Sequence, residues 1–158
     1  MKRTQQMAHR FREVIINGLW IANTNYKDQL SNVTLKQANT KIGSLNTIAA
    51  LTFHVNYYIA GMLNVFEGGA LEIKDKYSFD MPPVNSQEGW KKLFTDLNTN
   101  DEKFANLIEL MPDKKLDEVF VEIKYGTYQR NIEAMIEHSY YHLGQVSLIK
   151  KMILETSN

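Results

Sequence analysis

The chain has 158 residues, a length that fits one domain and lets a core be buried without disulfides or metals as supports. It contains no cysteine, which excludes disulfides and thiolate metal ligands, so any thiol in a reaction here must belong to a small molecule. Eighteen basic residues balance eighteen acidic ones, which gives no electrostatic reason to expect a nucleic acid or an acidic membrane as partner. No apolar run has the length of a signal peptide or a membrane span. We therefore expect a single cytoplasmic domain over residues 1–158.

The first predicted helix covers residues 4–25, where apolar side chains recur every three or four positions. Its apolar stripe consists of Met7, Phe11, Val14, Ile15, Gly18, Leu19 and Ala22. His9 lies away from this stripe and is predicted to be on the surface. A polar connection over residues 27–43 follows, with one helical turn expected at 35–38.

The second predicted helix covers residues 44–66, with Ser44 as its N-cap. It ends at Glu67-Gly68-Gly69, because glycine commonly follows the last helical residue. Its apolar face has His54 at the centre, which indicates that this imidazole faces the core. A long loop over residues 70–85 comes next.

The third predicted helix begins at Ser86 and is stopped by Pro112. Residues 116–125 alternate in a way that predicts a short extended segment. Thr127 then caps a fourth helix that runs to residue 154. Four long amphipathic helices predict an all-α four-helix bundle with this extended segment before the last helix, and with long connections that shape a pocket at one end.

Two histidines share one face of the last predicted helix, in the stretch IEHSYYHLGQ. His138 and His142 are four positions apart, so their rings lie one above the other. Such a pair alone is most often exposed or satisfied in a core. His54 strengthens the interpretation of this pair as a metal site, because a core-facing imidazole needs partners for both ring nitrogens. That partner is either a tyrosine or backbone group, or a metal ion shared with His138 and His142. Three imidazoles suit zinc, nickel or iron and leave coordination positions open for a small molecule.

These residues resemble the DinB/YfiT-like family of metalloenzymes. The likeness lies in His54 on the second helix, the extended segment, the HxxxH pair His138 and His142 on the last helix, and the Gly144-Gln145 that follows. It implies a four-helix bundle in which the three histidines hold one divalent ion. It also implies a thiol-dependent transferase that uses a low-molecular-weight thiol such as bacillithiol or mycothiol, an isomerase of the maleylpyruvate type, or a metal-dependent hydrolase. No catalytic residue can be named from it.

Two other functions are alternatives to the hypothesis that the protein is an enzyme. One is a bundle that binds a metal or a small molecule without catalysis, and the absence of an unambiguous general base favours it. The other is a dimerisation module whose histidines only pack. In each case a homodimer is expected, because Trp20, Ile21 and Ile136 lie off the main apolar stripes and are candidates for an exposed interface.

Several further residues are candidates for the surroundings of the site. Asp101 interrupts the apolar stripe of the third helix, either as a fourth ligand, a base or a partner of a ligand imidazole, or as a residue at the end of the bundle or a local cap in the polar stretch NTNDEK. Five polar residues are expected to flank the histidines, as substrate contacts, as partners of a ligand ring or as packing: Tyr57, Tyr58, Tyr141, Asn131 and Gln145. Met62 and Met135 are predicted to fill the core rather than to bind a metal.

Overall fold

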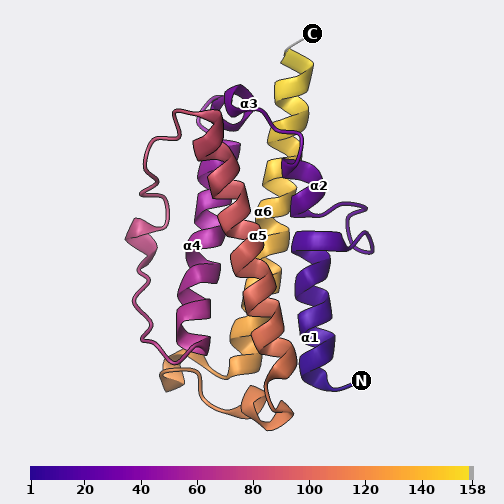
Figure 1. Cartoon of the computed structure of the whole chain (residues 1–158), viewed down its shortest axis with the longest axis vertical. Helices are drawn as coiled ribbons and strands as arrows, with labels where there is room; N and C mark the ends of the chain where they lie inside the picture. Colours follow the sequence, from indigo (N-terminus) through magenta and orange to yellow (C-terminus); the bar gives the residue numbers. More distant parts are fainter. Residues whose placement is uncertain (157–158) are drawn as a thin grey trace.

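Helices make up nearly all the regular structure of the computed structural model, which describes residues 1–156. The α-helices are α1 (Arg3–Arg12), α2 (Tyr26–Leu30), α3 (Leu35–Asn39), α4 (Ile48–Phe66), α5 (Gln87–Leu110) and α6 (Tyr128–Thr156). Helices α1, α4, α5 and α6 are the long ones and lie side by side, with α5 packed against both α1 and α4, and α6 against α4 (Figure 1). Within residues 1–156 there is no strand, so the all-α prediction is confirmed. No helix in this range has the length and apolar character needed to cross a membrane.

The first helix is shorter than predicted. Helix α1 continues into one π-helical turn, η1 (Glu13–Asn17), which is closed by the hydrogen bond from the amide of Gly18 to the carbonyl of Glu13 at 3.0 Å. The helix ends there because the backbone of Gly18 is extended, with φ at −90° and ψ at 152°. A Cβ on Gly18 would lie 1.9 Å from Cγ of Glu13, so this turn requires glycine. Leu19 and Ala22, which were predicted to lie on the buried stripe, are therefore in the following turn and exposed.

Two short helices occupy the connection to α4. The side chain of Asn25 accepts from the amide of Asp28 at 2.9 Å and caps α2, which brings the fully buried Tyr26 into the core. Helix α3 contains the turn predicted at 35–38.

The N-cap of α4 lies three residues later in the chain than predicted. Thr47, not Ser44, is its N-cap, and its hydroxyl accepts from the amide of Ala50 at 3.1 Å. The helix ends as predicted, with Gly68 at a φ of +94°. Because α4 buries side chains on most of its circumference, other elements must cover it from several sides.

The predicted start of α5 at Ser86 and the predicted cap of α6 at Thr127 are confirmed. Ser86 Oγ accepts from the amide of Gly89 at 3.0 Å, and Thr127 Oγ1 accepts from the amide of Arg130 at 3.2 Å. Each hydroxyl satisfies an amide that the helix itself leaves without a partner.

The extended segment predicted at 116–125 is wrong. This connection consists of two 3₁₀ turns, η3 (Asp113–Asp117) and η4 (Ile123–Tyr125), with a single bridge between Val119 and Thr127. Val121 has a φ of +48°, a conformation that interrupts an extended run.

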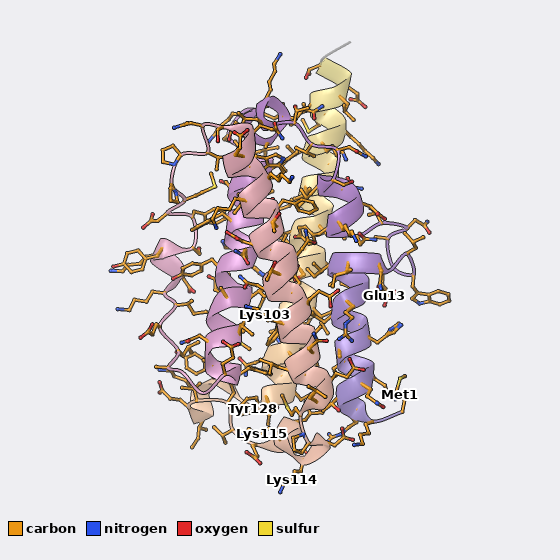
Figure 2. The ribbon with its side chains drawn as sticks, in the orientation of Figure 1. Met1, Glu13, Lys103, Lys114, Lys115 and Tyr128 are labelled. Carbon is orange, nitrogen blue, oxygen red and sulfur yellow. The ribbon has the colours of Figure 1, made fainter. Side chains whose placement is uncertain are left out.

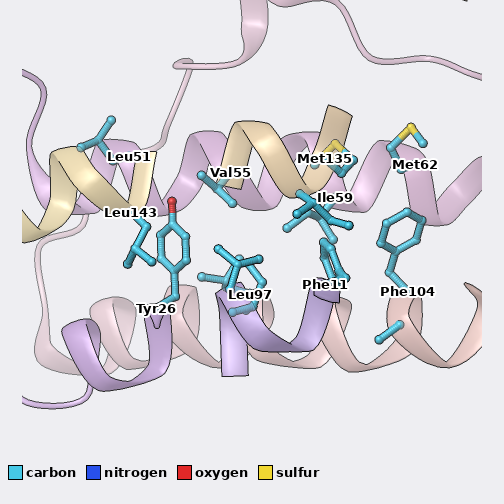
Figure 3. Packing of buried hydrophobic residues seen from close by; sticks show 14 of the residues in the cluster. Phe11, Tyr26, Leu51, Val55, Ile59, Met62, Leu97, Phe104, Met135 and Leu143 are labelled. Atoms are coloured by element: carbon cyan, nitrogen blue, oxygen red, sulfur yellow. The ribbon is translucent and has the colours of Figure 1, made fainter. Parts of the chain in front are cut away.

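The core lies between the four long helices (Figure 3). Phe104 of α5 is fully buried and contacts the rings of Phe11 and Phe66 edge-on, at centroid distances of 5.1 and 4.8 Å. Ile136 belongs to this core, so its predicted exposure is wrong: the residue sits on the inward face of α6. Trp20 is exposed, as predicted, with 87% of its surface accessible.

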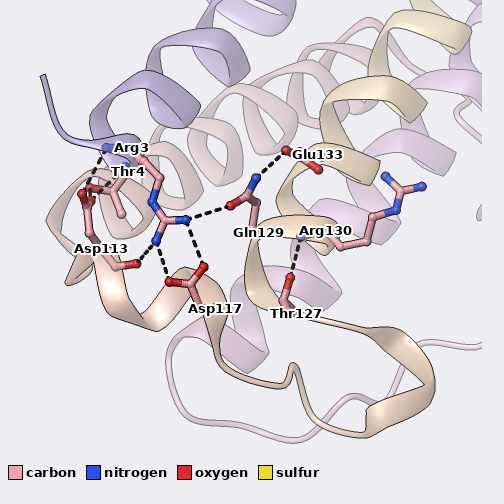
Figure 4. Close-up of polar contacts among 8 residues, drawn as sticks. All are labelled: Arg3, Thr4, Asp113, Asp117, Thr127, Gln129, Arg130 and Glu133. Atoms are coloured by element: carbon pink, nitrogen blue, oxygen red, sulfur yellow. Dashed lines mark hydrogen bonds and ion pairs between the residues drawn. The ribbon is translucent and has the colours of Figure 1, made fainter.

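The chain's beginning is fastened to the connection between α5 and α6. Arg3 makes a bidentate pair with Asp117, at 2.9 and 2.6 Å, and the carboxylate of Asp113 accepts from the amides of Arg3 and Thr4 (Figure 4). These hydrogen bonds lower the pKa of Asp113 below its usual range, and the hydrogen bond from the Thr4 amide has the largest effect.

A cation–π contact joins the same connection to the start of α6. The ammonium of Lys115 lies 4.6 Å from the ring centroid of Tyr128 (Figure 2).

We predict that Phe104→Ala lowers the free energy of unfolding by about 3–5 kcal/mol, because it removes a fully buried ring and leaves a cavity between two others. Urea unfolding followed by circular dichroism measures this loss. Leu110→Ala on the same helix is the matched control, since 81% of Leu110 is exposed. Equal losses in the two variants would contradict the assigned core.

Candidate metal centre

Three histidines meet between α4 and α6. His54 lies in the middle of α4, while His138 and His142 lie on successive turns of α6. One nitrogen from each ring lies within 4.8 Å of the other two, and Nε2 of His54 is 3.1 Å from Nε2 of His138. The sequence prediction that these three residues come together is therefore confirmed. His9 is exposed and lies outside the cluster, as predicted.

Hydrogen bonds orient two of the three rings. Nδ1 of His54 lies 3.2 Å from the carbonyl oxygen of Ser78, which can only accept, so Nδ1 carries the proton and Nε2 carries the lone pair. Nδ1 of His142 donates in the same way to Oε1 of Gln145 at 2.7 Å. Both rings thus present a basic Nε2, in the arrangement that carboxylates and carbonyls impose on metal-bound histidines.

The third ring is held differently. Because Nε2 of His54 has the lone pair, Nε2 of His138 must donate the proton in the contact between them. Nδ1 of His138 is buried and has no hydrogen-bond partner among residues 1–156. If Nε2 of His138 were to bind a cation, the proton of this ring would have to lie on Nδ1, where it finds no acceptor within residues 1–156. An unsatisfied buried donor costs about 1–3 kcal/mol, which makes His138 the least supported of the three nitrogen donors.

All three imidazoles are neutral at neutral pH. Burial lowers the pKa of His54, and repulsion from His142 adds to this effect. Burial lowers the pKa of His142 as well. Burial and the two neighbouring rings lower the pKa of His138 to about 4. The cluster therefore offers lone pairs, not positive charges, at the pH where a protein binds a divalent ion.

A loop between α4 and α5 covers the cluster, and sequence reasoning missed its contribution. The ring of Phe79 stacks on His54, with centroids 4.0 Å apart and planes 11° apart, and Ser78 supplies the carbonyl described above. The loop runs along the outer side of α4 (Figure 1). In the sequence, Phe79 is the residue that could have indicated this contact. It is an aromatic residue outside any predicted helix, so its ring must pack against another part of the chain.

The tyrosines of α4 hold this loop in place. Tyr57 exchanges hydrogen bonds with the backbone of Lys74, at 3.1 and 2.8 Å, and the hydroxyl of Tyr58 donates to Asp75 at 2.9 Å. The ring of Tyr58 also contacts His54 and His138 edge-on, each at 5.1 Å between centroids. Tyr58 therefore links the loop to two of the histidines.

The remaining flanking residues have separate roles. Asn131 donates to the carbonyls of Tyr125 and Thr127, both at 2.8 Å, and so fixes the turn before α6 rather than a ligand ring. Tyr141 is largely exposed and contacts the edge of His142 at 4.9 Å. Met62 and Met135 are buried in the core, as predicted.

Asp101 does not belong to the histidine cluster, and it lies within α5 rather than at an end of the helices. It is fully buried in the core, and neither carboxyl oxygen has a hydrogen-bond partner within residues 1–156, so it is no cap and no partner of an imidazole. The predictions for Asp101 are therefore wrong. Burial raises its pKa well above the usual range, and repulsion from Glu102 adds to this. This shift favours the protonated, neutral carboxylic acid inside the core.

The donor set fits a divalent transition metal. Three neutral imidazole nitrogens are the ligands that zinc, nickel and iron accept, and the described cluster contains no carboxylate that would favour calcium or magnesium. Among the residues that the structure describes, these three histidines form the one group of side chains that could bind such an ion.

Comparisons of the chain with models of protein families, with curated proteins and with solved structures gave no significant match.

We predict that replacing any of His54, His138 or His142 by alanine weakens zinc or nickel binding by about 100-fold or more, because each supplies one lone pair. Competition titration against a chelator, on protein made without a histidine tag, measures the affinity. His9→Ala is the control and should bind as the parent does.

The same titration separates ligands from supporting residues. Gln145→Ala should weaken binding by about 10–100-fold, less than loss of a ligand, because it only frees the ring of His142. If His54→Ala binds as tightly as the parent while His138→Ala does not, α4 contributes no ligand and the site is confined to α6.

We predict that the parent protein loses stability relative to Asp101→Asn as the pH rises. The pKa of Asp101 is raised in the folded state, so above pH about 4 the unfolded chain releases a proton that the folded chain keeps. The stability that this proton supports is complete below that pH and is lost as the pH rises. Denaturant unfolding of both proteins from pH 4 to 9 measures the difference, in which the effect of the histidines cancels. A difference independent of pH would mean that Asp101 is ionised in the fold.

Proposed function

We propose that His54, His138 and His142 bind one divalent ion, and that the protein is a metal-dependent enzyme of the DinB/YfiT-like type that joins a small-molecule thiol to an electrophile. The observation that carries the proposal is the convergence of three neutral imidazole nitrogens within 4.8 Å, two of them oriented by hydrogen bonds on Nδ1. A bound ion would lower the pKa of the thiol and fix the sulfur beside the electrophile.

In this reaction the sulfur–carbon bond of the product forms while the bond between carbon and the leaving group breaks. The thiol proton goes to a base and then to the leaving group or to water, so the step needs no oxidant and no further reactant. The thiol must come from outside, because the chain has no cysteine.

Asp75 is our candidate for the base. It accepts from the hydroxyl of Tyr58, whose ring contacts His54 and His138, and its charge raises the pKa of His54, against the larger lowering effect of burial. A carboxylate at the edge of the cluster can take the thiol proton and return it to solvent. Burial, followed by the hydrogen bond to Asp75, raises the pKa of Tyr58, so its phenol stays protonated as a donor.

The arrangement of the helices supports the same assignment. We propose that the long helices α1, α4, α5 and α6 are the four members of a four-helix bundle. The three histidines would then come from its second and fourth members, α4 and α6. This is the order that the resemblance implies. We propose this topology as the family's bundle, with α2 and α3 as additions in the first connection.

We predict that the zinc-, nickel- or iron-loaded protein accelerates the displacement of chloride from chlorodinitrobenzene by bacillithiol or glutathione. Asp75→Asn should lower the rate by about 100-fold while metal affinity stays the same, because the amide still accepts from Tyr58 but takes up no proton. Product absorbance measures the rate, and the chelator titration measures the affinity.

His142→Ala is the inactive control, and a run without thiol tests for a hydrolase. Metal binding without turnover of any electrophile in the panel would favour the non-catalytic binding protein. Turnover that is equal in parent and His142→Ala would rule out this site as the place of reaction.

A further inference from the structure

A cavity of about 470 Å³ lies beside the histidine cluster, between α4 and α6. Its size is within the about 300–1,000 Å³ of most ligand pockets. His138 and Tyr58 form its border with the cluster, and residues of the loops before α5 and α6, such as Lys74 and Tyr125, complete its lining. The lining is Tyr58, Met62, Leu71, Ile73, Lys74, Asp75, Phe120, Tyr125, Asn131, Ala134, Met135 and His138.

The floor of the cavity is apolar and deformable. Met62 and Met135 are buried from opposite helices, and Phe120 reaches inward from the connection before α6. Thioethers adapt to a flat ring and contact its edge favourably, and the ring of Phe120 offers a further aromatic contact. An aromatic ligand therefore gains more from this floor than an aliphatic one of equal volume.

The polar groups at the wall carry no net charge. Lys74 and Asp75 both line the cavity, and their charges oppose each other. The amide of Asn131 is already engaged by the carbonyls of Tyr125 and Thr127. An ionised ligand would lose hydration in this mostly apolar space, and either sign of charge would meet one like charge of the Lys74 and Asp75 pair.

From these observations we infer that the cavity is a binding site for an uncharged aromatic molecule, held with one edge against His138. The inference rests on the proposed function in one respect, that the edge at His138 is the reacting end. The electrophile is then a neutral aromatic compound, which the apolar floor favours over a dicarboxylate of the maleylpyruvate kind.

Substitution of Ala134 can fill the cavity without changing any of the three histidines. It lies one helical turn before His138 on the same face of α6, and it lines the cavity. A phenylalanine there would occupy the space, while serine would leave it open. Because Ala134 is only partly buried, the larger side chain does not have to enter the close-packed core.

The test is calorimetric titration at neutral pH with three probes that share one ring system: naphthol, naphthoate and naphthylmethylamine. We expect naphthol to bind at least about 10-fold more tightly than either ion. Ala134→Phe should weaken naphthol binding by at least about 10-fold, and Ala134→Ser should leave it within about 2-fold. Ala134→Leu replaces the phenylalanine variant if that protein fails to fold.

The two proposals fail in different ways. His142 does not line the cavity, so His142→Ala should keep naphthol binding while losing metal binding and turnover. Naphthol binding together with an absence of thiol transfer would remove the proposed function and leave the cavity assigned. Equal binding of naphthoate, unchanged binding in Ala134→Phe, or lost binding in His142→Ala would each overturn the inference.

Discussion

Helix α4 must be covered on nearly every side, and the rest of the molecule is arranged to do this. Its residues are apolar around most of the circumference, so exposure of any face would cost the burial that stabilises the fold. Helix α5 covers one face and α6 another, and the loop from α4 to α5 covers the remaining face with Phe79 and the backbone around Ser78. His54 lies at the place where α6 and the loop meet, which is why a buried imidazole there finds both a carbonyl and two further imidazoles.

Ionisable groups inside the protein are accommodated in two opposite ways. The three histidines have lost their positive charges to burial and are gathered so that one cation could replace them. Asp101 has no cation and no donor within the described residues, and it keeps its proton instead. The two solutions lie on different helices, since the histidines belong to α4 and α6 and the acid to α5. A polar residue in an apolar stripe is therefore not by itself a sign of the site.

Periodicity predicted what depends on local sequence. The stripe of α5, its start at Ser86, the cap at Thr127, and the convergence of His54 with His138 and His142 are correct, because each follows from helix geometry and one apolar face.

The errors arose where the backbone departs from a regular helix or strand. Gly18 could be read as part of a stripe, although its close approach to Glu13 closes the helix. Val119 and Val121 alternate as a strand would, but no partner strand exists within residues 1–156 and the backbone turns at Val121. The contact of Ser78 with His54 spans a loop that has no periodicity to read.

The cap of α1 has a consequence for the order in which the chain folds. The first amides of α1 are satisfied by Asp113, 109 positions beyond Thr4, and Arg3 is held by Asp117 of the same connection. Water serves these amides until that connection is in place, so α1 is completed only when a segment far along the chain has reached it. Contacts of such sequence separation slow the search for the native state, whereas the pairing of α4 with α5 needs only a loop to close. Helix α1 is thus expected to gain its final hydrogen bonds after the pairing of α4 with α5.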